Sequence, residues 1–110
     1  MKIISKSISK KLELSESTLF FDDRVHAILN YEYPWRRSNP LGHITASGLV
    51  ICDNKVLLIF HPFIRRWFQP GGHIDECDSP IEAAIREVYE ETGYVCELDS
   101  DSQDPIDIDI

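Results

Sequence analysis

With 110 residues, 43% of them hydrophobic, the chain can hold one domain with an apolar core. Its formal net charge of −8 disfavours general nucleic-acid binding, which needs a basic surface to meet phosphates. The sequence contains no run of about 18 apolar residues and no recognisable signal peptide, so we expect no membrane partner. Its three cysteines lack the spacing of a zinc site or a disulfide framework, which favours reduced thiols in a cytoplasmic protein.

The N-terminal part is predicted to be helical. Apolar residues recur there at helical spacing, at Leu19, Val25, Ile28 and Leu29. They predict an amphipathic helix within residues 15–31 that begins near Ser15 or Ser17. Prolines predict a loop over residues 33–40. We therefore divide the chain into an N-terminal helical region, residues 1–40, and a second region, residues 41–110.

The second region opens with predicted strands. Residues 43–52 and 55–61 read as two strands joined by a hairpin turn at Asp53-Asn54. A short strand over residues 67–69 leads into a predicted turn at residues 70–72. A further strand is expected over residues 94–98.

A helix is predicted from Pro80 to Thr92. Ser79 is suited to the N-cap, Pro80 to the first helical position, and Glu82 to a capping box with Ser79. Gly93 supplies the residue that ends a helix in the left-handed conformation. One stripe of the helix is apolar and predicts the core face: Ile81, Ala84, Ile85 and Val88.

The neighbouring face of this helix carries Glu87, Glu90 and Glu91. Like charges four residues apart destabilise a helix by about 0.2–0.5 kcal/mol, and the negative end of the helix dipole disfavours anions in the last turn. Arg86 can pair with Glu90, but one guanidinium cannot neutralise three carboxylates. A hard divalent cation such as Mg²⁺ can, and it leaves coordination positions for water and phosphate.

The segment from Gly72 to Tyr94 resembles the Nudix box of the Nudix hydrolase superfamily. The family pattern is G, five residues, E, seven residues, then R-E-U-x-E-E-x-G-U, where U is a bulky apolar residue. The matching positions are Gly72, Arg86, Glu87, Val88, Glu90, Glu91, Gly93 and, loosely, Tyr94. Asp78 stands where the pattern has Glu, and Cys77 stands where many members carry a glycine.

The resemblance implies an α/β fold, an α/β/α sandwich with a mixed sheet, here with an N-terminal helical extension. It implies hydrolysis of a small-molecule nucleoside diphosphate derivative with Mg²⁺ or Mn²⁺ as cofactor. The metal ligands would be the Gly71 carbonyl and the carboxylates of Glu87, Glu90 and Glu91. Arg86 would hold the glutamates in position, with Gly72, Asp78 and Gly93 supporting the site. The general base would be Glu87, Glu91 or a residue downstream of the box.

Residues before the box are candidates for substrate binding. Arg65 and Arg66 can contact phosphates, Trp67 can stack on a base or sugar, and His61 lies close in sequence. The alternative is a solvated loop in which Trp67 anchors the core. Two further positions allow two readings each. His73 either touches a ligand or fills a strand position, and Ala83 either leaves room for a ligand or is a simple helix former.

The last residues alternate between isoleucine and aspartate, at Ile106, Asp107, Ile108, Asp109 and Ile110. Alternation of this kind predicts a half-buried strand. Relatives usually continue with more sheet and a second helix, so the resemblance implies that the C-terminal part of the domain is missing. An uncovered edge favours a homodimer or larger assembly, or else a marginally stable chain with weak hydrolase activity.

Two other functions agree with the same residues. One is a non-catalytic binding or regulatory module of the same fold, suggested by Asp78, Cys77 and the implied missing segment. The other is an isomerase of the isoprenoid diphosphate kind, which would need further acid and base residues.

Overall fold

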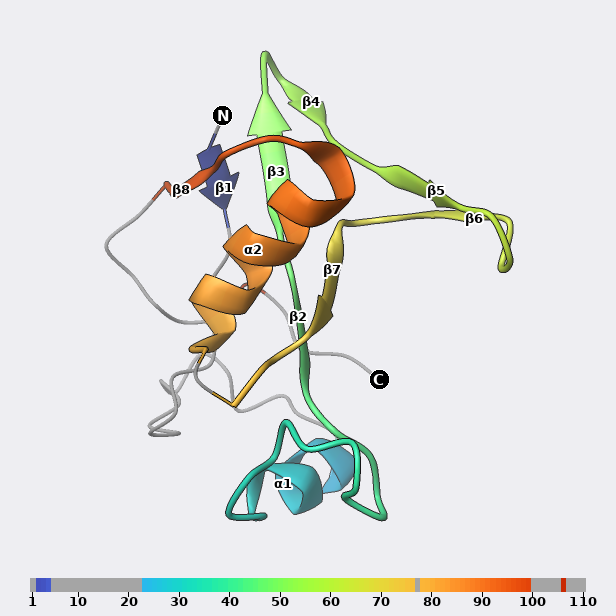
Figure 1. Cartoon of the computed structure of the whole chain (residues 1–110), viewed down its shortest axis with the longest axis vertical. Helices are drawn as coiled ribbons and strands as arrows, with labels where there is room; N and C mark the ends of the chain where they lie inside the picture. Colours follow the sequence, from blue (N-terminus) through green and yellow to red (C-terminus); the bar gives the residue numbers. More distant parts are fainter. Residues whose placement is uncertain (1, 5–22, 77, 100–105, 107–110) are drawn as a thin grey trace.

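The computed structural model describes residues 2–4, 23–76, 78–99 and 106. These residues form two helices and eight strands arranged in three small sheets (Figure 1). The helices are α1 (Asp23–Leu29) and α2 (Pro80–Thr92). The strands are β1 (Lys2–Ile4), β2 (Thr45–Ser47), β3 (Leu49–Cys52), β4 (Lys55–Val56), β5 (Ile59–His61), β6 (Arg66–Phe68), β7 (Gly71–His73) and β8 (Glu97–Leu98).

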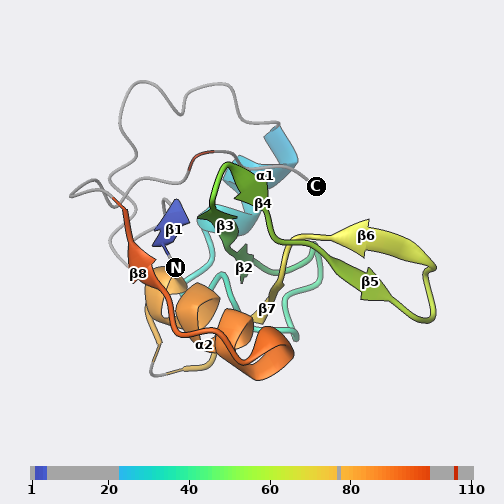
Figure 2. The same cartoon turned by 90° about the horizontal axis from the view of Figure 1, so that it is seen from above.

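The largest sheet is mixed, as predicted, with the strand order β4-β3-β1-β8. Strand β1 pairs antiparallel with β3 and parallel with β8. The N-terminal segment thus completes the sheet next to β3, a role that the sequence did not reveal. Helix α2 crosses this region and packs on β2 and β7, whereas α1 lies beyond the start of β2 (Figures 1 and 2). The result is an α/β fold.

The prediction of one continuous strand over residues 43–52 is wrong in one respect. The strand is interrupted at Gly48, whose N–H donates to the Pro70 carbonyl at 2.9 Å. Strand β2 before the break pairs with β7, and β3 after it pairs with β1 and β4. The interruption lets one stretch of chain serve two sheets.

The strand predicted over residues 55–61 is likewise split, into β4 and β5. The hairpin turn before it is confirmed. Asp53 and Asn54 both have positive φ angles, of 50° and 58°, as a two-residue turn between β3 and β4 requires. The strand predicted over residues 94–98 is reduced to β8.

The turn predicted at residues 70–72 is wrong, because Gly71 and Gly72 belong to strand β7. The glycines are needed there for close packing and not for a reversal. A Cβ atom at Gly71 would lie 2.5 Å from the Ser47 Cβ and 2.6 Å from the Ala46 carbonyl oxygen, so no larger residue fits against β2.

Helix α2 has the predicted bounds and caps. The Ser79 hydroxyl accepts from the Glu82 N–H at 3.2 Å, and the Ser79 N–H donates to the Glu82 carboxylate at 2.8 Å. Gly93 has a φ of 78° and donates its N–H to the Tyr89 carbonyl at 2.8 Å. Both helix ends are therefore satisfied by local residues, which explains why the sequence specified them.

The core lies between α2 and the sheets. Val50, Val88 and Cys96 form its buried centre, with Leu57 and Ile85 packed against them. The buried side of α2 also includes Ala83, which was not part of the predicted apolar stripe and has an exposed fraction of 0%. Burial of Ala83 favours its structural reading over a role in leaving room for a ligand.

The helix and the loop predicted in the N-terminal part are confirmed where the structure describes them, but residues 2–4 of this region, predicted to be helical, form strand β1. Helix α1 agrees with the second half of the predicted helix, whose expected start at Ser15 or Ser17 lies outside the described residues. Residues 33–40 form turns, as predicted, with the Asn39 side-chain amide donating to the Tyr33 carbonyl at 2.8 Å.

At the other end of the chain, Ile106 is 48% exposed, and Ile108 and Ile110 lie outside the described residues. The terminal strand and the self-association that depends on it therefore stay predictions. In the part of the chain that the structure describes, neither helix is long and apolar enough to span a membrane.

Replacing the N-cap of α2 tests the local account of this helix. We expect Ser79→Ala to lower the free energy of unfolding by about 1 kcal/mol, because the Glu82 N–H loses its acceptor. Ser79→Asp keeps an acceptor at the same position and should retain most of the stability. Urea unfolding followed by circular dichroism measures both. Equal stability of the Ala variant and the wild type would show that the cap contributes nothing.

Candidate functional site

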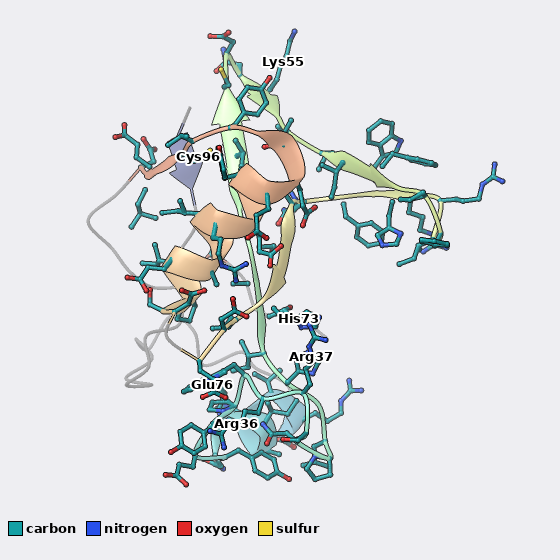
Figure 3. The ribbon with its side chains drawn as sticks, viewed as in Figure 1. Arg36, Arg37, Lys55, His73, Glu76 and Cys96 are labelled. Carbon is teal, nitrogen blue, oxygen red and sulfur yellow. The ribbon has the colours of Figure 1, made fainter. Side chains whose placement is uncertain are left out.

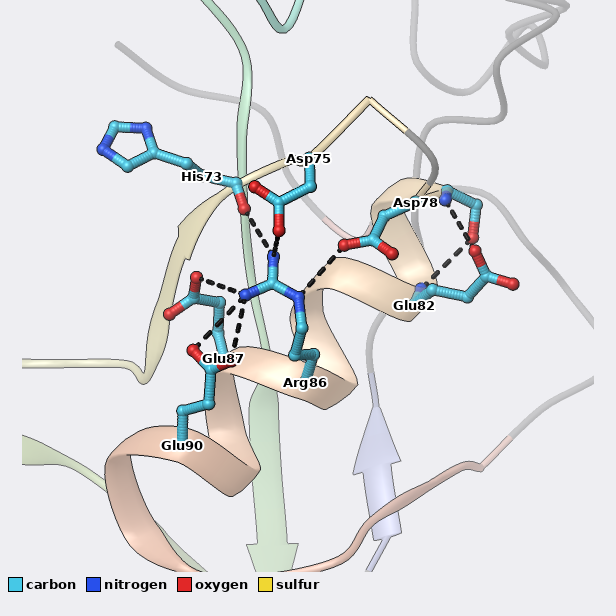
Figure 4. Close-up of polar contacts among 8 residues, drawn as sticks. His73, Asp75, Asp78, Glu82, Arg86, Glu87 and Glu90 are labelled. Atoms are coloured by element: carbon cyan, nitrogen blue, oxygen red, sulfur yellow. Dashed lines mark hydrogen bonds and ion pairs between the residues drawn. The ribbon is translucent and has the colours of Figure 1, made fainter.

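Arg86 is the centre of the polar network on α2 (Figure 4). Its Nη1 donates to the Glu87 carboxylate at 3.0 Å and to the Glu90 carboxylate at 3.3 Å. These contacts hold two of the three predicted metal-binding glutamates in one place. The predicted role of Arg86 in positioning the glutamates agrees with this geometry.

The other nitrogens of Arg86 bind the segment between β7 and α2. Its Nε donates to the Asp78 carboxylate at 3.0 Å, and its Nη2 donates to the His73 carbonyl at 2.9 Å and lies 3.5 Å from the Asp75 carboxylate. Partial burial alone would lower the pKa of Arg86, but its hydrogen bonds to Asp78, Glu87 and Glu90 raise that pKa above the ordinary arginine value. The guanidinium is therefore fixed on all sides and stays charged.

Because Gly72 has no side chain, the Glu87 carboxylate can pack directly against strand β7. A Cβ atom at Gly72 would lie 2.6 Å from the carboxyl carbon of Glu87. Any side chain at this position would push the Glu87 carboxylate away, so the glycine acts directly on the geometry of the site. The structure thus gives the supporting role predicted for Gly72 a physical basis.

The carboxylate of Glu91, also on α2, lies close to Gly71 at the start of strand β7. The Gly71 N–H donates to the Glu91 carboxylate at 3.3 Å. Burial, together with the nearby Glu87 and Glu90, raises the pKa of Glu91 above its ordinary value, while the Gly71 N–H works in the opposite direction. Glu87 and Glu90 are both paired with Arg86, whereas Glu91 makes no ion pair with that guanidinium.

The donor set suits a hard divalent cation. Within the described residues, no three His, Cys, Asp or Glu side chains are already grouped so that they could hold a metal ion. The fit depends instead on the Glu87–Glu91 pair, in which Glu87 raises the pKa of Glu91. A cation relieves that electrostatic conflict, and carboxylate oxygens are the ligands that Mg²⁺ and Mn²⁺ prefer.

The four residues predicted to bind substrate lie on a projecting arm and away from α2. His61, Arg65, Arg66 and Trp67 belong to the β5–β6 hairpin, which extends from the body of the molecule in both views (Figures 1 and 2). Trp67 is 65% exposed and contacts Phe60 edge to face, with 5.3 Å between ring centroids. The alternative reading, in which Trp67 anchors the core, is wrong.

The tip of this arm is an ordered turn. His61 accepts a hydrogen bond at Nδ1 from the Ile64 N–H at 3.3 Å, and its carbonyl accepts from the Arg65 N–H at 2.7 Å. Arg65 adopts a positive φ of 59° to complete the turn. His61 therefore shapes the arm that carries Arg65, Arg66 and Trp67.

His73 at the end of β7 meets His43, which lies just before β2, a contact that the sequence did not reveal. His43 Nε2 lies 3.2 Å from His73 Nδ1, and Arg37 lies close to His73 (Figure 3). Burial lowers the pKa of His73, and the charges of Arg37 and His43 lower it further. The pairing depends on the β2–β7 register, in which Thr45 faces His73, so no local signal in the sequence could have revealed it.

Comparison with known proteins agrees with this arrangement. The NUDIX domain family matches residues 42–103, which is more than half of the chain and includes α2 and the strands around it. The chain belongs to the Nudix family. No solved structure gives a significant match.

Curated relatives match the same region. A probable DHNTP pyrophosphohydrolase of Lactococcus lactis subsp. cremoris is 40% identical over 65 residues, or 59% of this chain and 39% of the relative. An RNA pyrophosphohydrolase of Bartonella henselae is 38% identical over 63 residues, or 54% and 36% of the two chains. Phosphatase NudJ of Escherichia coli O1:K1 is 36% identical over 53 residues, or 46% and 35%. The aligned part of this chain spans less than two fifths of each of these relatives.

The raised pKa of Glu91 leads to a pH-dependent prediction. A carboxyl whose folded-state pKa is raised contributes stability below its ordinary pKa of 4.5, and this contribution is lost as the pH rises through the higher folded value. Glu91→Gln cannot ionise, so without divalent metal we expect it to exceed wild-type stability by about 0.5 kcal/mol at pH 7, a small value because Glu91 is largely exposed. The difference should vanish near pH 4.

Urea unfolding at both pH values, with EDTA present, measures this difference. Glu97→Gln, on the exposed part of β8, removes the same charge away from the cluster and serves as the control. Destabilisation by Glu91→Gln at pH 7 would contradict the prediction.

Proposed function

We propose that this chain carries the catalytic centre of a Mg²⁺- or Mn²⁺-dependent Nudix hydrolase that cleaves the diphosphate linkage of a nucleoside diphosphate derivative. The observation that carries the proposal is the packing of Glu87 and Glu91 against the backbone of Gly71 and Gly72, beside a fully engaged Arg86. The names of the relatives agree in describing hydrolysis at phosphate groups, and they differ in the substrate.

Glu87, Glu91 and Glu90 would hold the metal, with the Gly71 carbonyl as a further oxygen ligand. A bound divalent cation lowers the pKa of a coordinated water and offsets negative charge on diphosphate oxygens. The protein's own contribution is the fixed position of its carboxylates. Glu87 is held by Arg86, so its charge stays at one place relative to β7.

Glu91 is the residue best suited to accept a proton from water. Its carboxylate makes no ion pair with Arg86, whereas Glu87 and Glu90 are both paired with that guanidinium and are less free to accept a proton. We therefore favour Glu91 over Glu87 as the general base.

Asp78, which stands where the family pattern has Glu, still contacts Arg86, and this weakens the case for a non-catalytic module. The Asp78 carboxylate reaches Arg86 Nε at 3.0 Å in spite of its shorter side chain. The contact that positions Arg86 is thus retained. Product analysis distinguishes the remaining alternatives, because hydrolysis yields two phosphorylated products, isomerisation keeps the diphosphate intact, and a binding module yields no product.

Divalent cations should stabilise the folded chain, because they bind the folded carboxylate cluster in preference to the unfolded one. We expect Mg²⁺ or Mn²⁺ to raise the melting temperature of the wild type. Glu87→Gln and Glu91→Gln should each abolish the shift and lower kcat by about 100-fold or more, since each removes a ligand. Glu97→Gln should keep both properties. An unchanged metal response in Glu91→Gln would remove Glu91 from the site.

The projecting arm supplies a second test, of substrate binding. The exposed face of Trp67 is suited to stacking on a base or sugar, and Arg65 and Arg66 are suited to phosphate contacts. Base–aromatic stacking contributes about 1–3 kcal/mol, so we expect Trp67→Ala to raise KM about tenfold or more with little change in kcat.

Phe63 lies at the tip of the same arm and is 91% exposed. Phe63→Ala therefore serves as the control for loss of an aromatic side chain from the arm. Steady-state kinetics on a panel of nucleoside diphosphate derivatives would make the measurement. Equal KM values in the wild type and Trp67→Ala would place substrate binding elsewhere.

A further inference from the structure

The N-terminal loop is tied to the segment that precedes α2 by one side chain, Arg36. Its Nε donates to the Glu76 Oε1 at 2.7 Å, and its Nη2 donates to the Glu76 Oε2 at 3.3 Å. The guanidinium carbon also lies 3.7 Å from the centre of the Tyr33 ring. Arg36 is thus held by a two-point ion pair and by a cation–π contact, which restrict its position more than a single contact would.

Glu76 lies between the two aspartates that bind Arg86. Asp75 lies directly before it, 3.5 Å from Arg86 Nη2, and Asp78 accepts from Arg86 Nε at 3.0 Å. The Asp78 N–H also donates to the Asp75 carbonyl at 3.0 Å, which closes a tight turn around Glu76. A contact that fixes Glu76 therefore fixes the turn that presents both aspartates.

The turn between β7 and α2 is exposed to solvent. Within the described residues it belongs to neither a helix nor a strand, and the side chains of Asp75 and Glu76 are 70% and 56% exposed. Arg36 reaches the turn from 40 residues away in the sequence and connects it to the loop after α1 (Figure 3).

We propose that Arg36 is a positioning residue for the candidate active site. By fixing Glu76, Arg36 holds Asp75 and Asp78 against the guanidinium of Arg86, which in turn orients Glu87 and Glu90. The consequence for metal binding rests on the proposed function, whereas the effect on Arg86 does not. The loop that Arg36 anchors lies outside the segment that matches the NUDIX domain, so the site would depend on a part of the chain that the family match does not include.

The ion pair is exposed, and exposed pairs contribute little to folding stability. The expected effect is therefore on the position of Arg86, with little change in the melting temperature. In Arg36→Gln, we expect the Arg86 Nε–H to exchange with solvent about 3- to 10-fold faster, because the turn that holds Asp78 against it opens more often once the exposed ion pair is lost. NMR of the arginine Nε–H group in the full chain measures this rate without any metal.

Two matched variants make the test specific. Arg37→Gln removes the same charge from the neighbouring position of the same loop and should leave the exchange rate of the Arg86 Nε–H near the wild-type value. The double exchange Arg36→Glu with Glu76→Arg restores an ion pair of opposite direction and should restore slow exchange. Slow exchange in Arg36→Gln, or equally fast exchange in Arg37→Gln, would overturn the proposal, as would failure of the double exchange to restore the rate.

Mn²⁺ binding, measured by electron paramagnetic resonance, adds the functional readout. We expect Arg36→Gln to raise the Kd for Mn²⁺ about 3- to 10-fold. This is less than the roughly 10- to 100-fold typical of a residue that contacts a metal ligand, because Arg36 acts through Arg86. If the wild type bound no Mn²⁺, the proposed function would fail while the exchange measurement still decided the role of Arg36. If the wild type bound Mn²⁺ and Arg36→Gln bound it equally well, the positioning role would fail alone.

Discussion

The contacts of the Arg86 guanidinium are the constraint on which the rest of the site depends. Three glutamates near the end of one helix repel each other and oppose the helix dipole. Arg86 makes the arrangement stable by holding Glu87 and Glu90 with one nitrogen and the segment before the helix with the other two. Glu91 makes no ion pair with Arg86, and partial burial together with the charges of Glu87 and Glu90 raises its pKa.

The same constraint explains why the sequence around Arg86 is so restricted. Gly71 and Gly72 bring strand β7 close to both β2 and the Glu87 carboxylate, and neither position has room for a Cβ atom. The caps at Ser79 and Gly93 fix where α2 begins and ends, and thereby fix which residues of β7 lie opposite the glutamates. Backbone packing and helix termination therefore act on the same few side chains.

Features that depend on neighbouring residues could be predicted from the sequence, whereas features that depend on distant residues could not. The bounds and caps of α2, and the Asp53-Asn54 turn, follow from neighbouring residues and were correct. The partners of each strand were not predictable, because the break at Gly48 and the straight path of Gly71-Gly72 are set by packing against distant strands. Similarly, the motif identified Arg86 and its glutamates, but the contacts of Arg86 with Asp75 and the His73 carbonyl required the folded chain.

The ion pair between Arg36 and Glu76 joins the turn before α2 to the N-terminal loop. Arg36 and Glu76 are separated by 40 residues, and neither belongs to the Nudix pattern. Glu87 and Glu90 are held by Arg86 on the same helix. The turn that presents Asp75 and Asp78 is instead held by Arg36 in the N-terminal loop. The arm with Trp67 projects from the opposite end of β7. Because the turn and the arm leave β7 at opposite ends, we expect substitutions in the arm to leave the position of Arg86 unchanged.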